Sequence, residues 1–186
     1  IGDGVSYAPH GFPDVKELDV DFYTFSLYKT YGPHVALLYG KEKILKKLPN
    51  QNHEFLNGQY PYTINPGGPN HEELVSLIGI FDYFNNLYNH HFKNKDISIL
   101  KKIDKINNLI SVHEESIANP LLDYLSSRND LKLIGKNKIK NKNRAPTISF
   151  VSHKKSSKEI SNKLVENKIA TRNDNFYAWR CLKYLG

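Results

Sequence analysis

Lys29 is the residue of this sequence best suited to covalent chemistry. It lies in FSLYKTYGPH (25–34), where a predicted strand runs into a small hydroxyl residue, the lysine and a Gly-Pro turn. Lysine is seldom drawn into apolar surroundings. Such surroundings lower the pKa of the amine and make it a nucleophile, which suits Schiff-base formation with an aldehyde. The alternative is a surface lysine at a strand end, with its charged head in water.

Asp3 is a second candidate, near another predicted strand end. Enzymes that use pyridoxal phosphate need a lysine for the aldehyde and often an acid facing the pyridinium nitrogen, so that the ring accepts electrons. A parallel sheet would deliver both groups to one edge, because ligands bind at the carboxyl ends of its strands. Taken alone, Asp3 is an ordinary loop residue.

Short strands and loops must position these two residues. Aromatic and β-branched residues predict a strand over 19–28, and a second, buried strand is expected over 35–40. Residues 41–48 are a candidate for a short helix, and 49–69 form a loop rich in Asn, Gly and Pro. Two strands cannot make a sheet that buries itself. The first 48 residues therefore look like the end of a larger parallel α/β sheet.

The middle of the chain is predicted to be helical. Apolar residues at spacings of three and four predict a helix over 71–92, with Asn70 as its N-cap. Further helices are expected over 96–110 and 112–127, where Pro120 marks a kink or a fresh start.

The last third has a different pattern. Strands are predicted at 131–134, 147–152 and 169–172. Between the last two, Ser156 and Glu159 have the spacing of a capping box, which predicts a helix starting there. Three helices followed by strand, helix and strand describe a small α/β unit.

Composition excludes several classes of protein. The chain is 39% hydrophobic and 24% charged, as in a globular protein, and no run approaches 18 apolar residues, so no membrane span is expected. Cys181 is the single cysteine, which excludes an intrachain disulfide. There is no methionine, so we expect the chain to be processed or part of something longer.

The basic residues are unevenly distributed. The chain has 26 Lys and Arg against 19 Asp and Glu, and its net charge is +7. Six of the basic residues lie in one stretch without an acid, and that stretch has no interleaved aromatics, unlike most nucleic-acid sites. A solvated hairpin is the preferred interpretation, and nucleic-acid binding is not expected. The six are Lys132, Lys136, Lys138, Lys140, Lys142 and Arg144.

Histidines do not predict a metal site. His71 opens HEELV, which lacks the second histidine of a zinc HExxH motif. His90 and His91 are adjacent and would point to different faces of a helix. We therefore expect no metal.

The first 40 residues also carry a family resemblance. GDGVSYAPHGFPDVKELDVDFYTFSLYKTYGPHVALLYG resembles the cofactor-lysine region of class V aminotransferases, in the cysteine desulfurase-like branch of fold-type I pyridoxal phosphate enzymes. The features that match in order are the early aspartate, the loop with Pro-His and Asp-Val, the Ser-x-x-Lys-x-x-Gly-Pro turn and the Leu-Tyr strand. INPGGPNHEEL (64–74) and the segment from APTISFV to IATRNDNFYA resemble later parts of the branch, so the resemblance spans nearly the whole chain.

The resemblance implies roles for individual residues around the cofactor. Lys29 would hold the aldehyde and move protons at the substrate α-carbon, while Asp3 would face the ring nitrogen. Ser26 and Tyr28 would bind the phosphate, with Tyr28 in place of the family's usual histidine. Ser6 stands where the family has a glutamine near the ring oxygen.

Other implied roles lie later in the chain. Gly67 and Gly68 stand where the family's Gly-Thr turn reaches the phosphate of a neighbouring subunit, and Gly68 lacks the hydroxyl. Arg172 matches an arginine that faces substrate. Where desulfurases then carry their persulfide cysteine, this chain has Phe176 and Tyr177.

Cys181 comes four residues later, and we give it no such role. A small buried hydrophobic residue is the preferred interpretation for it.

The resemblance implies an α/β fold made of three parts. These are the end of a pyridoxal phosphate-dependent transferase large domain with a parallel or mixed sheet (1–48), a linker loop (49–69) and a small C-terminal α/β domain (70–186). The expected function is part of a cytoplasmic, homodimeric enzyme that acts on an amino acid by C–S lyase, transaminase or racemase chemistry. The alternative is a non-catalytic basic module that binds an anionic partner such as RNA.

Overall fold

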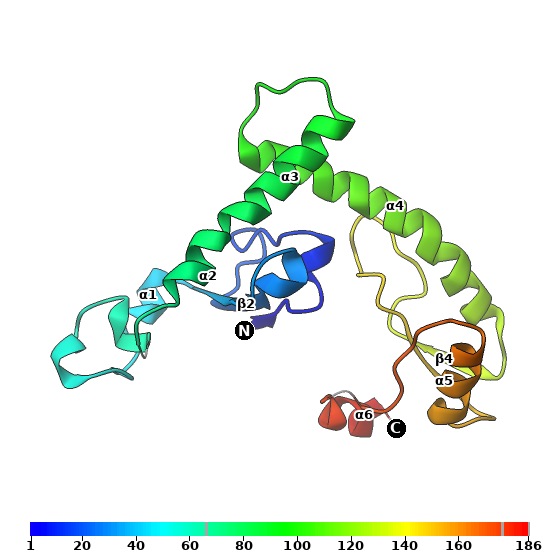
Figure 1. Cartoon of the computed structure of the whole chain (residues 1–186). Helices are drawn as coiled ribbons and strands as arrows, with labels where there is room; N and C mark the ends of the chain where they lie inside the picture. Colours follow the sequence, from blue (N-terminus) through cyan, green and yellow to red (C-terminus); the bar gives the residue numbers. More distant parts are fainter. Residues whose placement is uncertain (66, 176, 186) are drawn as a thin grey trace. The chain divides into compact units, whose positions relative to one another are not determined.

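The computed structural model describes residues 1–65, 67–175 and 177–185. Contacts divide the chain into two compact units, Ile1–Val112 and His113–Gly186. The long helix α4 (Ile99–Ser127) contributes its first half to one unit and its second half to the other (Figure 1). The domain boundaries expected at residues 48 and 69 concern the complete protein and stay predictions.

A three-stranded mixed sheet forms the base of the first unit. Its order is β1-β2-β3, with β1 (Gly2–Asp3) parallel to β2 (Phe22–Ser26) and β2 antiparallel to β3 (Ala36–Gly40). The tight turn between β2 and β3 reverses the chain, which a parallel neighbour would not allow. Leu37 and Leu38 are exposed, so the expectation that 35–40 is a buried strand was wrong for the described chain.

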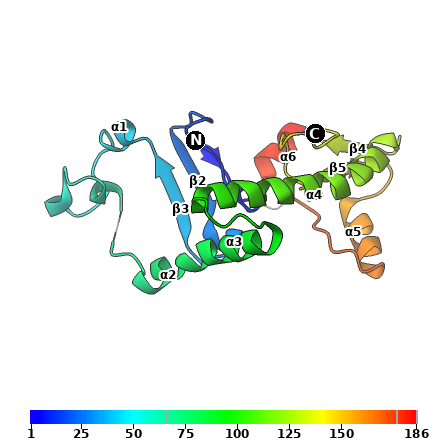
Figure 2. The same cartoon turned by 90° about the horizontal axis from the view of Figure 1, so that it is seen from above.

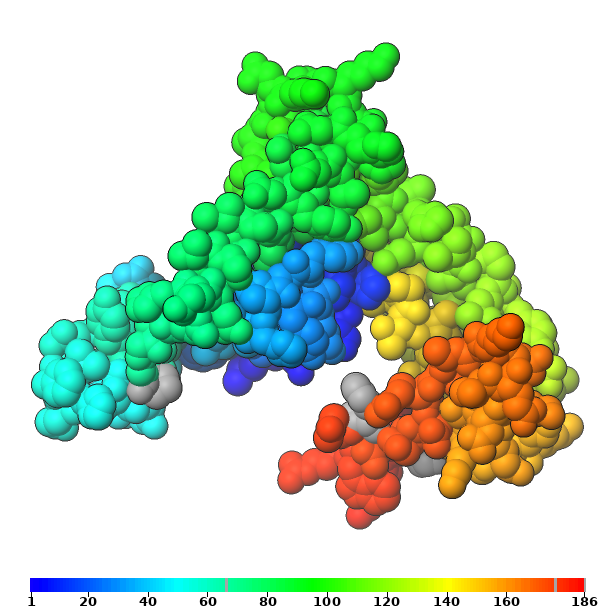
Figure 3. Space-filling view, viewed as in Figure 1, coloured from blue at the N-terminus to red at the C-terminus, as the bar shows by residue number. Residues whose placement is uncertain are grey.

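Two consecutive helices form the segment predicted to be helical at 71–92. They are α2 (His71–Ser76) and α3 (Ile78–His91), and the Asn70 side chain accepts the backbone N–H of Glu73, as expected of an N-cap. Helix α3 and the first half of α4 cover one face of the sheet (Figures 1 and 2), and their apolar side chains pack on it. In the space-filling view, the blue residues of the N-terminal segment adjoin the green residues of the helices (Figure 3). The buried residues of this core are Ala8, Tyr23, Phe25, Leu27, Ile80, Phe84, Tyr88, Ile103 and Ile106.

The second unit is built on a β-hairpin. The antiparallel strands β4 (Leu131–Ile134) and β5 (Ser149–Ser152) confirm two predicted strands, and α5 (Ser157–Glu166) starts with the predicted capping box. Residues 169–172 form no strand, because no neighbouring strand pairs with them. The chain ends in α6 (Trp179–Leu185).

The two helices expected over 96–110 and 112–127 are one. Pro120 lies inside α4 without ending it. A proline removes one intrahelical hydrogen bond, and the buried side chains on either side of it, Ala118 and Leu122, pack on Ile139 and offset that loss. No helix among the described residues is long and apolar enough to cross a membrane.

The remaining elements are short and connect the larger ones. Residues 41–48 contain the predicted helix as the single turn α1 (Glu42–Leu45). The described part of the first unit also has four short 3-10 turns. One of them, η2 (Leu27–Thr30), carries the candidate lysine; the others are η1 (Ala8–His10), η3 (Glu54–Leu56) and η4 (Tyr62–Ile64).

Candidate active site

The candidate lysine lies on a rigid turn. Lys29 belongs to η2 (Leu27–Thr30), which begins directly after β2. The Leu27 N–H donates to the Val35 carbonyl at 2.8 Å and closes the turn, and the Gly32 N–H donates to the Leu27 carbonyl at 2.9 Å. The Thr30 hydroxyl, 1% exposed, also donates to the Leu27 carbonyl, at 3.0 Å. Together, these three hydrogen bonds fix the backbone on either side of Lys29.

Helix α3 holds this turn from the other side. The Tyr31 and Tyr83 rings lie 4.4 Å apart, and Tyr31 also meets Phe84 edge-on. Gly32 approaches the helix so closely that a Cβ there would lie 2.7 Å from the Ile80 Cδ1 atom. A side chain at Gly32 would therefore force the Ile80 side chain to shift.

Three polar side chains in and beside the turn are available for a ligand. Ser26 and Lys29 are half-buried, and Tyr28 is 47% exposed. Among the described residues, the Ser26 hydroxyl, the Tyr28 phenol and the Lys29 amine have no hydrogen-bond or ion-pair partner in the chain. Two hydroxyl donors and one amine on a fixed backbone form a set that fits a phosphorylated aldehyde.

Asp3 ends the strand next to this turn. It is the register partner of Thr24 in the parallel pair of β1 and β2. Tyr23 and Phe25 are buried in the core, so the alternation of the strand puts Thr24 and Ser26 on the opposite face, with Asp3. The sheet thus brings Asp3 and the start of the Lys29 turn to the same edge and the same face.

One oxygen of the Asp3 carboxylate already accepts a hydrogen bond. Its Oδ1 atom accepts the Val5 N–H at 3.0 Å, which holds the carboxylate at the strand end. Burial raises the pKa of the neighbouring Tyr23 phenol, and the charges of Tyr7 and Asp3 add to that rise. Ser6 is exposed in the turn after β1.

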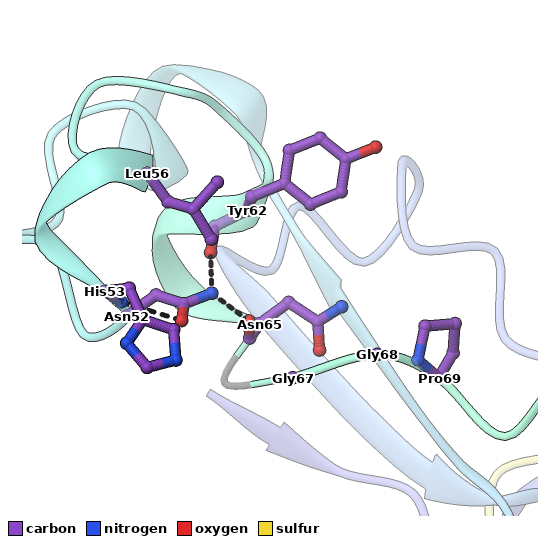
Figure 4. A pocket seen from close by; sticks show the side chains of 8 residues that line it. All are labelled: Asn52, His53, Leu56, Tyr62, Asn65, Gly67, Gly68 and Pro69. Atoms are coloured by element: carbon purple, nitrogen blue, oxygen red, sulfur yellow. Dashed lines mark hydrogen bonds between the residues drawn. The ribbon is translucent and has the colours of Figure 1, made fainter.

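Gly67 and Gly68 lie in a different part of the first unit. They line a hollow of about 330 Å³ together with Asn52, His53 and Tyr62, among others (Figure 4). The Asn52 amide donates to the carbonyls of Tyr62 and Asn65 and so ties the two ends of this loop together. A Cβ would meet nothing within 4 Å at either glycine. Both therefore have open space for a ligand, but they do not join the Lys29 turn within the described chain.

Arg172 belongs to the second unit. Its relation to Lys29 stays a prediction. Cys181 is exposed on α6, so the expectation of a buried residue was wrong for the described chain. Phe176 lies outside the described residues, and Tyr177 is exposed. No group of three or more metal-ligating side chains occurs in the ranges that the structure describes.

One contact of the turn was missing from the sequence prediction. The Tyr28 and His34 rings stack with centroids 4.7 Å apart and planes 22° from parallel. Both residues flank the Gly-Pro turn, six positions apart. A ring on each side of a tight reversal is the signal that would have suggested the pair.

Comparisons with known proteins now give this arrangement a family. The family model for aminotransferase class V matches residues 1–175. The aminotransferase-like protein FGM3 of Gibberella zeae is 31% identical, over 85% of this chain and 36% of its own length. A probable cysteine desulfurase of Pseudomonas putida is 27% identical, over 100% of this chain and 43% of its own length. The chain belongs to the class V aminotransferase family.

Solved structures agree on the fold. The cysteine desulfurase CsdA of Escherichia coli has a TM-score of 0.57 to this chain at 23% identity, over 91% of this chain and 40% of CsdA. The expected α/β fold and the resemblance to the cysteine desulfurase-like branch are confirmed. The alternative of a basic, non-catalytic module is not favoured. The chain spans less than half the length of these relatives.

Proposed function

We propose that the complete protein is a pyridoxal phosphate-dependent enzyme that acts on an amino acid. The observation that carries the proposal is the Lys29 turn, whose amine has no partner among the described residues. Its backbone is fixed by hydrogen bonds, and it lies at the carboxyl end of a strand parallel to the one that ends at Asp3. The family match and the names of the relatives support it.

The residues present fit the cofactor. Ser26 and Tyr28 would hold its phosphate, Lys29 its aldehyde carbon and Asp3 its ring nitrogen. Asp3 suits that task because, within the described chain, its Oδ1 atom accepts the Val5 N–H and its Oδ2 atom has no hydrogen-bond partner. Ser6 would reach the ring oxygen through a bridging water, because its side chain is short.

We infer the remaining contacts of the complete protein from the family pattern. Gly67 and Gly68 offer backbone N–H groups to the phosphate of a neighbouring subunit, which makes the enzyme a homodimer. Arg172 contacts the substrate.

Each residue has a physical task in the reaction. When bound, the cofactor supplies an electron sink for the negative charge that develops at the substrate α-carbon. With the cofactor bound, the Lys29 amine would be the base that removes the α-proton and the acid that returns it. The Asp3 carboxylate holds a proton on the ring nitrogen by its negative charge. The hydrogen bonds of the turn fix the backbone that carries Lys29, which would lower the entropic part of the barrier.

The branch of chemistry is decided after the α-proton has left. Transamination, racemisation and C–S lyase chemistry all share proton removal by Lys29. Sulfur transfer to an enzyme thiol needs a cysteine near Arg172, and the chain has Phe176 and Tyr177 at the corresponding place. The proposal therefore assigns no sulfur acceptor to Cys181.

Visible absorbance tests the proposal. The protein, purified as the source cell makes it and mixed with pyridoxal phosphate, is expected to gain an absorption band in the visible. Lys29→Arg keeps the positive charge but removes the nucleophilic amine, so the band is expected to be absent. Lys47→Arg, at an exposed position after α1, is the matched control and keeps the band. A band of equal strength in all three proteins would contradict the proposal.

A further inference from the structure

We propose that His34 and Tyr28 form a paired-ring site that binds the phosphate of the cofactor. This inference rests on the proposed function and adds His34 to the residues named there. The two rings are stacked, with centroids 4.7 Å apart and planes 22° from parallel. Hydrogen-bond donors lie in the plane of each ring, so the stack presents two nearly parallel planes of donors.

Apart from their stacking on each other, the polar atoms of Tyr28 and His34 are available to a ligand in the described chain. Tyr28 is 47% exposed and His34 is also exposed. Neither side chain has a hydrogen-bond or ion-pair partner within the described ranges of the chain. A phosphate with several acceptor oxygens satisfies donors of this kind, and hydrogen bonds to an ionised group are about twice as strong as neutral ones.

The turn fixes the pair before any ligand arrives. The bond from the Leu27 N–H to the Val35 carbonyl joins the residues next to Tyr28 and His34, so it holds the two arms of the turn beneath the stack. Pro33 restricts the backbone immediately before His34. A site already in its binding geometry loses little entropy on binding.

Charge also favours an anion at this place. Lys29 comes directly after Tyr28, and its amine has no acidic partner among the described residues. The phenol that stands where the family has a histidine cannot carry a positive charge. His34, stacked on the Tyr28 ring, supplies an imidazole to this turn in place of the one that is absent at position 28.

Comparing the cofactor with its unphosphorylated form tests the inference. His34→Phe keeps a ring for stacking but removes both nitrogens, and His34→Gln keeps a donor without the ring. Affinity for pyridoxal phosphate is expected to fall about tenfold or more in His34→Phe and by less in His34→Gln. Affinity for pyridoxal, which has no phosphate, is expected to stay within twofold in both variants. The measurement is absorbance titration, with circular dichroism to verify folding.

Two outcomes would overturn the inference. Unchanged affinity for pyridoxal phosphate in both variants would mean that His34 only packs on Tyr28. An equal loss for pyridoxal and pyridoxal phosphate would mean that His34 supports the turn and not the phosphate. Failure of the proposed function looks different: neither form of the cofactor would give a band that depends on Lys29, even in the unaltered protein.

Discussion

Asp3 and Thr24 are register partners across the two parallel strands of the first unit. Thr24 is two residues before Ser26, the last residue of β2 before the lysine-bearing turn. Both residues lie on the same face of the sheet as Asp3. A one-residue slip of β1 would move Asp3 to the core face. The burial of Tyr23 and Phe25 thus fixes on which side of the sheet the acid lies.

The approach of Gly32 to α3 predicts a stability change. In Gly32→Ala the new Cβ would lie 2.7 Å from the Ile80 Cδ1 atom and 3.1 Å from the Leu27 carbonyl oxygen. We expect a loss of about 1–3 kcal/mol in unfolding free energy, measured by urea denaturation. Gly79→Ala is the matched control: it lies in α3 with nothing within 4 Å, so it should gain about 0.5–1 kcal/mol.

A second substitution separates this clash from other causes. Ile80→Val removes the Cδ1 atom and should cost about 0.5–1.5 kcal/mol alone. Together with Gly32→Ala, the loss should be smaller than the sum of the two, because the closest contact is gone. Strict additivity would mean that the contact with Ile80 is not the cause.

Asn119 of α4 holds the loop between β4 and β5 by two hydrogen bonds to Ile139. Its amide donates to the Ile139 carbonyl at 3.1 Å, and its Oδ1 atom accepts the Ile139 N–H at 2.9 Å. Ile139 is 3% exposed, so Asn119→Ala leaves buried backbone groups unsatisfied. We expect a loss of about 1–3 kcal/mol. Asn108→Ala, exposed on the same helix, should change stability by less than about 0.5 kcal/mol. Equal effects of the two would refute the anchoring role.

Arg128 and Asp130 should make stability depend on pH. The Arg128 Nη2 and Nε atoms donate to the two carboxylate oxygens of Asp130 at 2.7 and 2.8 Å. This pairing holds the pKa of Asp130 below its usual value. A lowered folded-state pKa gives stability that is present above the unfolded pKa and is lost as the pH falls through the folded one.

Asp130→Asn is therefore expected to destabilise at neutral pH and to match the unaltered protein below the folded-state pKa. Thermal unfolding measured across that pH range gives the difference. The Arg128→Gln variant should remove the same pH-dependent part, and the double variant should add nothing to it. A constant difference at every pH would contradict the pairing.

Local patterns in the sequence predicted the elements that depend on local physics. The spacing of apolar residues located α3, and Ser156 with Glu159 located the start of α5. Residues 169–172 look like a strand by composition, but a strand also needs a partner, and none of the described strands pairs with them. Pro120 suggested a break, yet packing on Ile139 carries the helix through it.

The site was predictable to the same degree. The types and order of Asp3, Ser26 and Lys29 were visible in the sequence, and the parallel pairing of β1 and β2 brings their strand ends together. The stack of His34 on Tyr28 was missed. Two ring residues on either side of the turn are visible in the sequence, but whether they touch depends on how tightly the turn closes between Leu27 and Val35. The same holds for the fit of Gly32 against Ile80.

The central claim is that Lys29, of all the lysines in the chain, bonds to the cofactor. The most direct test treats the protein with pyridoxal phosphate, reduces it with borohydride to make any bond between the cofactor and a lysine permanent, and locates the modified residue by peptide mass spectrometry. We expect modification at Lys29, at one cofactor per chain. Modification spread over the exposed lysines, with Lys29 not preferred, would contradict the claim.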